Sequence, residues 1–144
     1  MSANEKVAVQ GQGQGNAVVV HALSDATGNT AVGLVEAAAV QFPRGKVGVS
    51  RLSHVESIEQ VKAYLDRYVP LGEETIVYHT VLNPELRREV RDEAERRGIA
   101  SVDLLGPAMG MLGQMLGEEP LNVPGLVADR AGRVIRTVDA RLLS

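Results

Sequence analysis

The sequence contains no cysteine and no tryptophan, and it has only one phenylalanine and three tyrosines. The absence of cysteine excludes disulfides, thiolate metal sites and thiol nucleophiles, and it favours a cytoplasmic location. Because aromatic residues make up 3% of the chain, the core must consist of Val, Leu, Ala and Ile. The same shortage argues against single-stranded nucleic acid as a ligand, since proteins bind it by stacking bases on aromatic rings.

Positive charge is also scarce. The chain has 15 basic and 18 acidic residues and a formal net charge of -3, so no global basic field would attract nucleic acid. No apolar run approaches the roughly 20 residues that span a bilayer, and the first 16 residues contain no hydrophobic signal core. We therefore expect neither nucleic acid nor a membrane as a partner.

The chain divides into three parts by composition. Residues 1–16 include a Gly-Gln alternation that cannot bury enough apolar surface to become ordered, which predicts a flexible tail. Residues 17–118 read as one α/β domain of ordinary size. Residues 119–144 read as a C-terminal extension that packs on the domain, with a turn at Gly132 followed by a strand.

Apolar runs and helical patterns alternate along the predicted domain. Buried strands are expected at 17–23, 46–52, 74–82 and 99–106, and helices at 28–42, 57–69, 84–98 and 107–117. Asn83 is predicted to cap the third helix, with Pro84 in its first turn and Gly98 just past its end. This order predicts a Rossmann-like fold with a four-stranded parallel sheet, most simply in the order 2-1-3-4.

The loop after the first strand, "SDATGNT", is rich in small and polar residues. In open parallel sheets, ligands bind beyond the carboxyl ends of the strands, where the strand order reverses. The start of the next helix would direct free N–H groups and a positive dipole end at an anion. The natural ligand of such a loop is a phosphate or a carboxylate, and its candidate binding residues are Ser24, Asp25, Thr27, Gly28, Asn29 and Thr30.

Two other interpretations of the loop stay open at this point. Ser, Thr, Asp and Asn are the preferred helix caps, so capping alone would account for one or two of these residues. Asp25, placed after a buried strand and followed by Thr27 and Gly28, also resembles the phosphorylated aspartate of haloacid-dehalogenase-type enzymes. Asp25 is therefore a candidate nucleophile of a small phosphate-handling enzyme. The phosphate loop GxxxxGK[ST] is absent from the 144 residues.

Other candidate residues lie at the predicted strand ends. Arg87 falls in the first turn after the third strand, near the expected ligand edge. His21 and His79 lie inside the first and third strands, where a hydrogen-bonded core histidine is more common than a metal ligand. His54 follows the second strand as a surface loop histidine or an acid-base group. We predict no metal site.

The last predicted helix, "PAMGMLGQMLG", combines Met109, Met111 and Met115 with three glycines. Core packing would explain its apolar character, because close packing offsets the helix cost of glycine. The alternative is an adaptable partner surface, which would make the chain a dimerising scaffold without a ligand.

Several segments together resemble the regulatory proteins of pyruvate, phosphate dikinase and phosphoenolpyruvate synthase. "LSDATGNTAVGLVEAAAVQFP" is similar to the family's S-D-S-T-G-E-T-A opening, helix and Q-F-P. "VLNPELRREVRDEAERRGIASVDLLGP" resembles its D-P-E-L-R segment and V-D-L-L-G-P strand, and "VPGL" also looks familial. The sequence departs from the family at Ala26 and Asn29, where the family has Ser or Thr and Glu.

The resemblance implies a bifunctional kinase and pyrophosphorylase. Family members phosphorylate a threonine of their partner enzyme with ADP and remove that phosphate with inorganic phosphate. Their nucleotide-binding phosphate loop lies in a C-terminal domain with no counterpart in this chain, so no cofactor site is identifiable and the implied ADP and phosphate site is not carried over. We expect an N-terminal domain that binds a phosphate-bearing ligand or the partner enzyme and is inactive as a kinase alone.

Overall fold

The computed structural model describes residues 17–126 and 138–140. The tail expected at residues 1–16 and the turn and strand expected around Gly132 lie outside the described residues.

The strands and helices alternate without exception from Val18 to Leu116, as predicted. The elements in chain order are β1 (Val18–Ser24), α1 (Asn29–Ala39), β2 (Val47–Leu52), α2 (Ile58–Tyr68), β3 (Thr75–Thr80), α3 (Pro84–Arg96), β4 (Ala100–Asp103) and α4 (Gly106–Leu116).

The four strands form one parallel sheet in the order β2-β1-β3-β4, which confirms the predicted order. β1 is central and pairs with β2 on one side and β3 on the other, and six of its seven residues are buried. Continuous burial explains why β1 is an unbroken apolar run rather than an alternating one. The strand order reverses at β1, so the loop after β1 lies at the switch point of the sheet.

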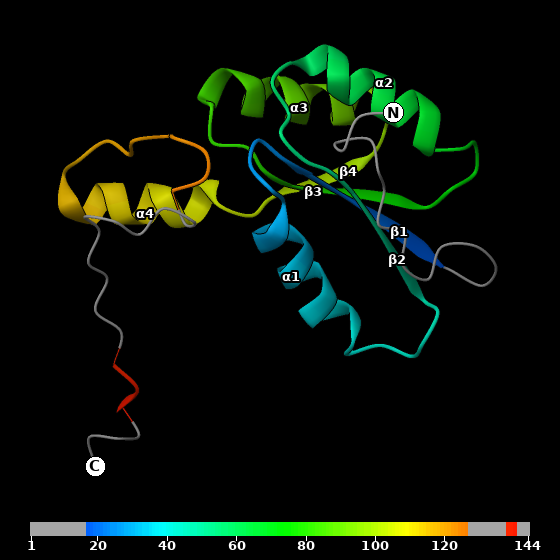
Figure 1. The fold of residues 1–144 in the computed structure, drawn as a ribbon, viewed down its shortest axis with the longest axis horizontal. Helices are drawn as coiled ribbons and strands as arrows, with labels where there is room; N and C mark the ends of the chain where they lie inside the picture. Colours follow the sequence, from blue (N-terminus) through cyan, green and yellow to red (C-terminus); the bar gives the residue numbers. More distant parts are fainter. Residues whose placement is uncertain (1–16, 127–137, 141–144) are drawn as a thin grey trace.

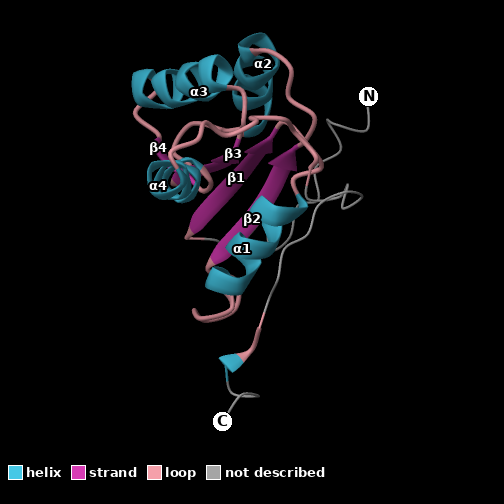
Figure 2. Ribbon diagram, turned by 90° about the vertical axis from the view of Figure 1, so that its left-hand side faces the viewer, coloured by secondary structure: helices cyan, strands magenta, loops and turns pink. Residues whose placement is uncertain are grey.

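Helices cover the sheet on both faces (Figures 1 and 2). α2 and α3 pack on one face, around an apolar cluster that includes Leu23, Leu65 and Val77. α1 packs on the other face, around a smaller cluster that includes Val20 and Val35. The core is therefore mainly aliphatic, as the scarcity of aromatic residues predicted, with Tyr64 as a buried aromatic residue in the larger cluster.

The helix ends of α3 follow the sequence signals. The Asn83 side chain accepts a 2.9 Å hydrogen bond from the Leu86 backbone N–H, and Pro84 is the first residue of the helix. Gly98 follows the helix with φ of 71°, a left-handed conformation that glycine adopts without strain. The predicted cap, first turn and stop are confirmed.

A buried polar network occupies the face of the sheet below α2. His21 is fully buried on β1, and its Nδ1 lies 2.7 Å from the Tyr64 hydroxyl and 2.9 Å from the Ser50 hydroxyl. Its Nε2 lies 3.0 Å from the Glu73 carboxylate, which also accepts from the Thr75 hydroxyl. His21 is thus the hydrogen-bonded core histidine that the sequence favoured, and the network joins β1, β2, β3 and α2.

One of the two interpretations of the last helix is wrong, and α3 contains a buried charge. α4 does not pack in the core: none of its residues is buried, and it lies beyond the carboxyl ends of the strands (Figure 1). On α3, which is rich in charged residues, Glu93 is only 5% exposed. Its carboxylate accepts hydrogen bonds from Arg96 and Arg97, which compensate the charge that burial would otherwise disfavour.

Candidate site at the carboxyl edge of the sheet

The loop between β1 and α1 folds around its own short side chains. The Ser24 hydroxyl accepts a 3.0 Å hydrogen bond from the Ala26 N–H, and the Thr27 hydroxyl accepts one of 3.2 Å from the Asn29 N–H. Gly28 has φ of 86°, which a side chain would make strained. These bonds turn the chain sharply from the strand into the helix.

Arg51 of β2 holds the loop from the neighbouring strand. Its Nη1 donates a 2.9 Å hydrogen bond to Asn29 Oδ1 and a 3.3 Å hydrogen bond to the Thr27 carbonyl. The Asn29 side chain is therefore engaged by Arg51. A positive charge lies directly beside the loop, where it would favour an anion.

Asp25 joins the loop to the next connection along the sheet. Its Oδ2 accepts hydrogen bonds of 2.7 Å from the Leu82 N–H and 3.3 Å from the Asn83 N–H. Its Oδ1 is buried and has no hydrogen-bond partner among the described residues. Asp25 therefore has a structural function through Oδ2, and Oδ1 is left without a partner from the described residues.

The start of α1 has no side-chain cap. Its N-cap residue is Gly28, which has no side chain that could accept a hydrogen bond, and of the first turn only the Asn29 N–H is satisfied by a loop side chain, that of Thr27. Val32 N–H donates to the Gly28 carbonyl, but the N–H groups of Thr30 and Ala31 find no acceptor within the described chain. Unpaired N–H groups in the first turn of a helix favour a bound anion.

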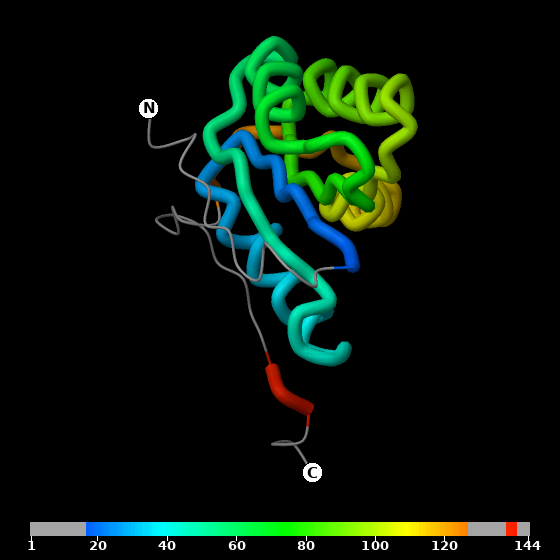
Figure 3. Tube along the Cα trace, turned by 90° about the vertical axis from the view of Figure 1, so that its right-hand side faces the viewer, coloured from blue at the N-terminus to red at the C-terminus, as the bar shows by residue number. Residues whose placement is uncertain are grey.

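These loop residues line one cavity of about 540 Å³. The far wall is formed by the segment after α4, which runs past the end of β1 (Figure 3). The lining residues are the whole loop 24–30, Thr80, Leu82, Leu105, Met109, Pro120, Leu121, Asn122, Val123, Gly125 and Leu126. The structure thus brings together all six candidate ligand-binding residues of the loop.

Arg87, the seventh candidate, lies outside this cavity. Its Nη1 lies 3.8 Å from Asp103 Oδ2, and it lines two neighbouring cavities of about 600 and 490 Å³. The larger shares Met109, Pro120 and Asn122 with the loop cavity. A row of three cavities therefore follows the carboxyl edge of the sheet.

Two parts of this site were missed from the sequence. Arg51 could have been found, because it is the penultimate residue of β2 and the predicted strand order placed β2 next to β1. The segment 120–126 was expected only to pack on the domain, and its position over the loop depends on contacts that no local signal encodes.

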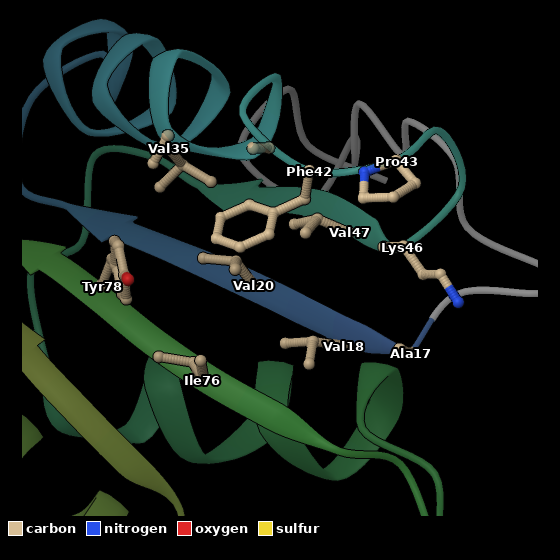
Figure 4. A pocket seen from close by; sticks show the side chains of 12 residues that line it. Ala17, Val18, Val20, Val35, Phe42, Pro43, Lys46, Val47, Ile76 and Tyr78 are labelled. Carbon is tan, nitrogen blue, oxygen red and sulfur yellow. The ribbon is translucent and has the colours of Figure 1, made fainter.

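A further cavity of about 470 Å³ lies at the opposite, amino end of the strands (Figure 4). Val18, Val20, Ile76 and Tyr78 line it from the sheet, and Phe42 overhangs it from the chain after α1. Such an apolar lining suits a hydrophobic group rather than an anion. This cavity also carries one cationic side chain, Lys46, at its rim, whereas the polar loop residues lie at the other end of the strands.

Neither a metal cluster nor a membrane helix is found in the part of the chain that the structure describes. Residues 17–126 and 138–140 contain no group of three or more His, Asp or Glu side chains placed to hold a metal ion. None of the helices in the same residues is both long and apolar enough to cross a bilayer.

Comparison with known proteins identifies relatives over most of the chain. Residues 20–141 match the family described as Kinase/pyrophosphorylase. The chain is 35% identical over 84% of its length to a putative pyruvate, phosphate dikinase regulatory protein of Geobacter sulfurreducens. Proteins with the same description are 33% identical over 76% of the chain in Oceanobacillus iheyensis and 32% identical over 84% in Sorangium cellulosum.

The match covers 44%, 40% and 42% of those three proteins, so the chain spans about two fifths of the length of these relatives. The family match over residues 20–141 starts within β1 and includes all later elements through α4. It also includes both walls of the loop cavity. The chain belongs to the kinase/pyrophosphorylase family.

Proposed function

We propose that this α/β domain takes part in regulating pyruvate, phosphate dikinase or phosphoenolpyruvate synthase by binding a phosphate-bearing ligand at the carboxyl edge of its sheet. Support for the partner comes from the relatives, which are described as putative pyruvate, phosphate dikinase regulatory proteins. Support for the ligand comes from the loop cavity.

The observation that carries the ligand proposal is the uncapped start of α1 inside that cavity. The N–H group of Thr30, which lines the cavity, has no acceptor in the described chain, and Gly28 lets a ligand approach the backbone closely. Arg51 holds the loop in this shape and adds positive charge. A phosphate oxygen would satisfy this free N–H group without displacing any hydrogen bond of the loop.

The same residues do not supply a nucleotide site by themselves. The 144 residues contain no GxxxxGK[ST] segment, which in phosphate-loop enzymes surrounds the nucleotide phosphates with backbone N–H groups and a lysine. We therefore propose that this chain binds ligand or partner but does not transfer phosphate alone. ADP-dependent threonine phosphorylation of purified pyruvate, phosphate dikinase by this chain would overturn that part.

Ligand binding is tested by titrating the chain with phosphate, pyrophosphate, ADP and ATP. At least one should raise the melting temperature and shift the backbone amide resonances of residues 28–31. Arg51→Met should weaken that ligand, because the loop loses its clamp. Arg44→Met is the matched control, since Arg44 is an exposed arginine at the amino edge of the sheet. Unmoved resonances at 28–31 with all four ligands would reject the proposal.

A second candidate function, a homodimeric scaffold, is favoured by α4. Its side chains Met111, Leu112, Met115 and Leu116 are between 61% and 80% exposed, and exposed apolar clusters mark interaction surfaces. Sedimentation equilibrium should then show a dimer that Met111→Glu and Met115→Glu dissociate. A monomer at all concentrations would exclude this candidate without affecting the ligand proposal.

A further inference from the structure

Beside the loop cavity lies a second polar cavity, between α3 and β4. It has a volume of about 490 Å³, and its wall residues are His79, Pro84, Arg87, Arg88, Arg91, Ser101, Asp103, Gly106 and Pro107. It shares no residue with the loop cavity. Neither the interpretation of the loop nor the proposed function accounts for its composition.

Three of the wall residues are arginines on one side of α3. Arg88 and Arg87 lie three and four positions before Arg91, so both share a side of the helix with Arg91. One wall residue, Asp103, is acidic, so the cavity carries an excess of two positive charges in a chain whose net charge is -3. Such a concentration is unfavourable unless an anion compensates it.

The local ion pairs leave this charge largely uncompensated. Arg87 Nη1 lies 3.8 Å from Asp103 Oδ2, which is too long for a hydrogen bond. Asp103 uses Oδ1 to accept from the N–H groups of Leu105 and Gly106, at 3.0 and 2.7 Å. Arg91 lies 3.7 Å from Asp92, with both side chains more than 60% exposed, where an ion pair contributes little.

His79 supplies the second, independent observation. It lines the cavity from β3, its side chain is 2% exposed, and its Nδ1 is buried without a hydrogen-bond partner in the described chain. A buried polar atom without a partner is rare in folded proteins and is a common mark of an unfilled ligand or water position. Positive charges and an unsatisfied imidazole nitrogen therefore meet at one place.

We propose that the cavity between α3 and β4 is a binding site for a phosphoryl anion, held by Arg87, Arg88 and Arg91 with His79 at its inner wall. Arginine is the residue of choice for phosphate, because its planar guanidinium donates two parallel hydrogen bonds to two oxygens. Inorganic phosphate and the diphosphate group of pyrophosphate share this chemistry. The site is separate from the loop cavity and does not depend on the proposed function.

The titration of His79 supplies a local readout. Burial lowers its pKa, Asp103 raises it, and Arg87 and Arg91 lower it. β3 lies between β4 and β1. On β4 His79 is paired with Asp103, and on β1 it is paired with Leu23, which carries no charge. An anion beside the arginines would offset their effect, so binding should raise the pKa of His79.

The experiment is an NMR titration of the full chain with inorganic phosphate and, separately, pyrophosphate. We expect saturable shifts of the His79 imidazole signals and a higher His79 pKa in the bound state. Arg88→Gln and Arg91→Gln, both at exposed positions, should each weaken binding about tenfold, the usual loss for one charge-assisted hydrogen bond. Arg44→Gln removes the same charge at the opposite edge of the sheet and should leave the affinity unchanged.

Three outcomes would overturn the proposal. The first is the absence of any saturable shift at His79 with either anion. The second is an equal loss of affinity in Arg44→Gln, which would indicate general charge screening. The third is unchanged affinity in both α3 variants while they remain folded by circular dichroism. If the first outcome is accompanied by shifts at residues 28–31, the result rejects this site and supports the loop cavity.

Discussion

The Leu82 backbone N–H donates a 2.7 Å hydrogen bond to the Asp25 carboxylate, across 57 positions of sequence. The bond links the loop after β1 to the loop after β3, which lie side by side because those strands are paired. Asn83, the cap of α3, donates a weaker bond to the same oxygen. One carboxylate thus fixes the two connections that flank the switch point of the sheet.

Replacing Asp25 should therefore destabilise the fold. Asp25→Ala leaves the Leu82 N–H without its acceptor and should lower the free energy of unfolding by about 1–3 kcal/mol. Asp25→Asn keeps a carbonyl oxygen and should cost less. Urea denaturation of the three proteins measures the difference.

The nucleophile interpretation of Asp25 makes a separate prediction. A phosphorylated aspartate is labile to hydroxylamine, and Asp25→Asn would not form it. If phosphodonors label the native chain in a hydroxylamine-labile form and fail to label Asp25→Asn, then Asp25 is a nucleophile as well as a structural link.

Two buried histidines predict how stability depends on pH. Burial lowers the pKa of His21 and of His79 below the ordinary value of 6.5, although Glu73 and Asp103 partly oppose the shift. The folded protein keeps both rings neutral, whereas the unfolded chain binds protons below pH 6.5. Stability is therefore full above pH 6.5 and falls as the pH decreases from there toward the folded pKa values.

The free energy of unfolding should fall with decreasing pH by at most about 1.4 kcal/mol per pH unit for each histidine. Urea denaturation between pH 7.5 and 5 should show this decline, and His79→Gln should make it shallower. His54→Gln is the matched control, because His54 is exposed. A stability that stays constant from pH 7.5 to 5 would contradict burial of neutral histidines.

Arg96 and Arg97 should contribute unequally to stability. Both donate to the buried Glu93 carboxylate, but the Arg96 side chain is 65% exposed and that of Arg97 is 21% exposed. Arg97 also pairs at 2.9 Å with Asp66, which joins α3 to α2. Arg97→Met should cost about 1–3 kcal/mol, and Arg96→Met less than about 1 kcal/mol. Equal losses in urea denaturation would contradict this difference.

The sequence was sufficient for most of the fold because its signals are local and mutually consistent. β1 is buried on both faces and therefore apolar at every position but His21 and Ser24, and Asn83, Pro84 and Gly98 mark the ends of α3. For α4 the sequence left both core packing and a partner surface open, because an apolar helix is usually buried. Nothing local distinguishes a core helix from one that presents its apolar side chains at the surface.

The candidate site was predicted only in part, for a related reason. The loop residues could be placed because strand order fixes where the loop after β1 lies. Asp25 was interpreted as a ligand or nucleophile, whereas its bonds to Leu82 and Asn83 depend on contacts 57 and 58 positions away. Arg87 was placed at the correct edge, but the structure puts it in a different cavity from the loop.

The three glycines of α4 should respond differently to alanine. A Cβ at Gly110 would meet no atom within 4 Å, so Gly110→Ala should stabilise the helix by about 1 kcal/mol. A Cβ at Gly113 would lie 2.9 Å from the Glu118 carbonyl, and one at Gly106 would lie 2.0 Å from Asp103 Oδ2. Both of these variants should be destabilised in thermal unfolding. Stabilisation of all three would mean that α4 packs differently.

Gly28 connects the stability of the loop to its proposed function. Its φ of 86° would strain any L-residue by about 1–2 kcal/mol, and a Cβ there would lie 3.3 Å from Arg51 Cδ. Gly28→Ala should therefore lower stability, displace the Arg51 clamp and weaken a ligand bound at residues 28–31. Gly33→Ala is the matched control, because a Cβ at that position in α1 meets no atom within 4 Å, and it should stabilise the helix. If Gly28→Ala binds phosphate or pyrophosphate at residues 28–31 as tightly as the native chain, then the backbone of this loop is not what holds the ligand.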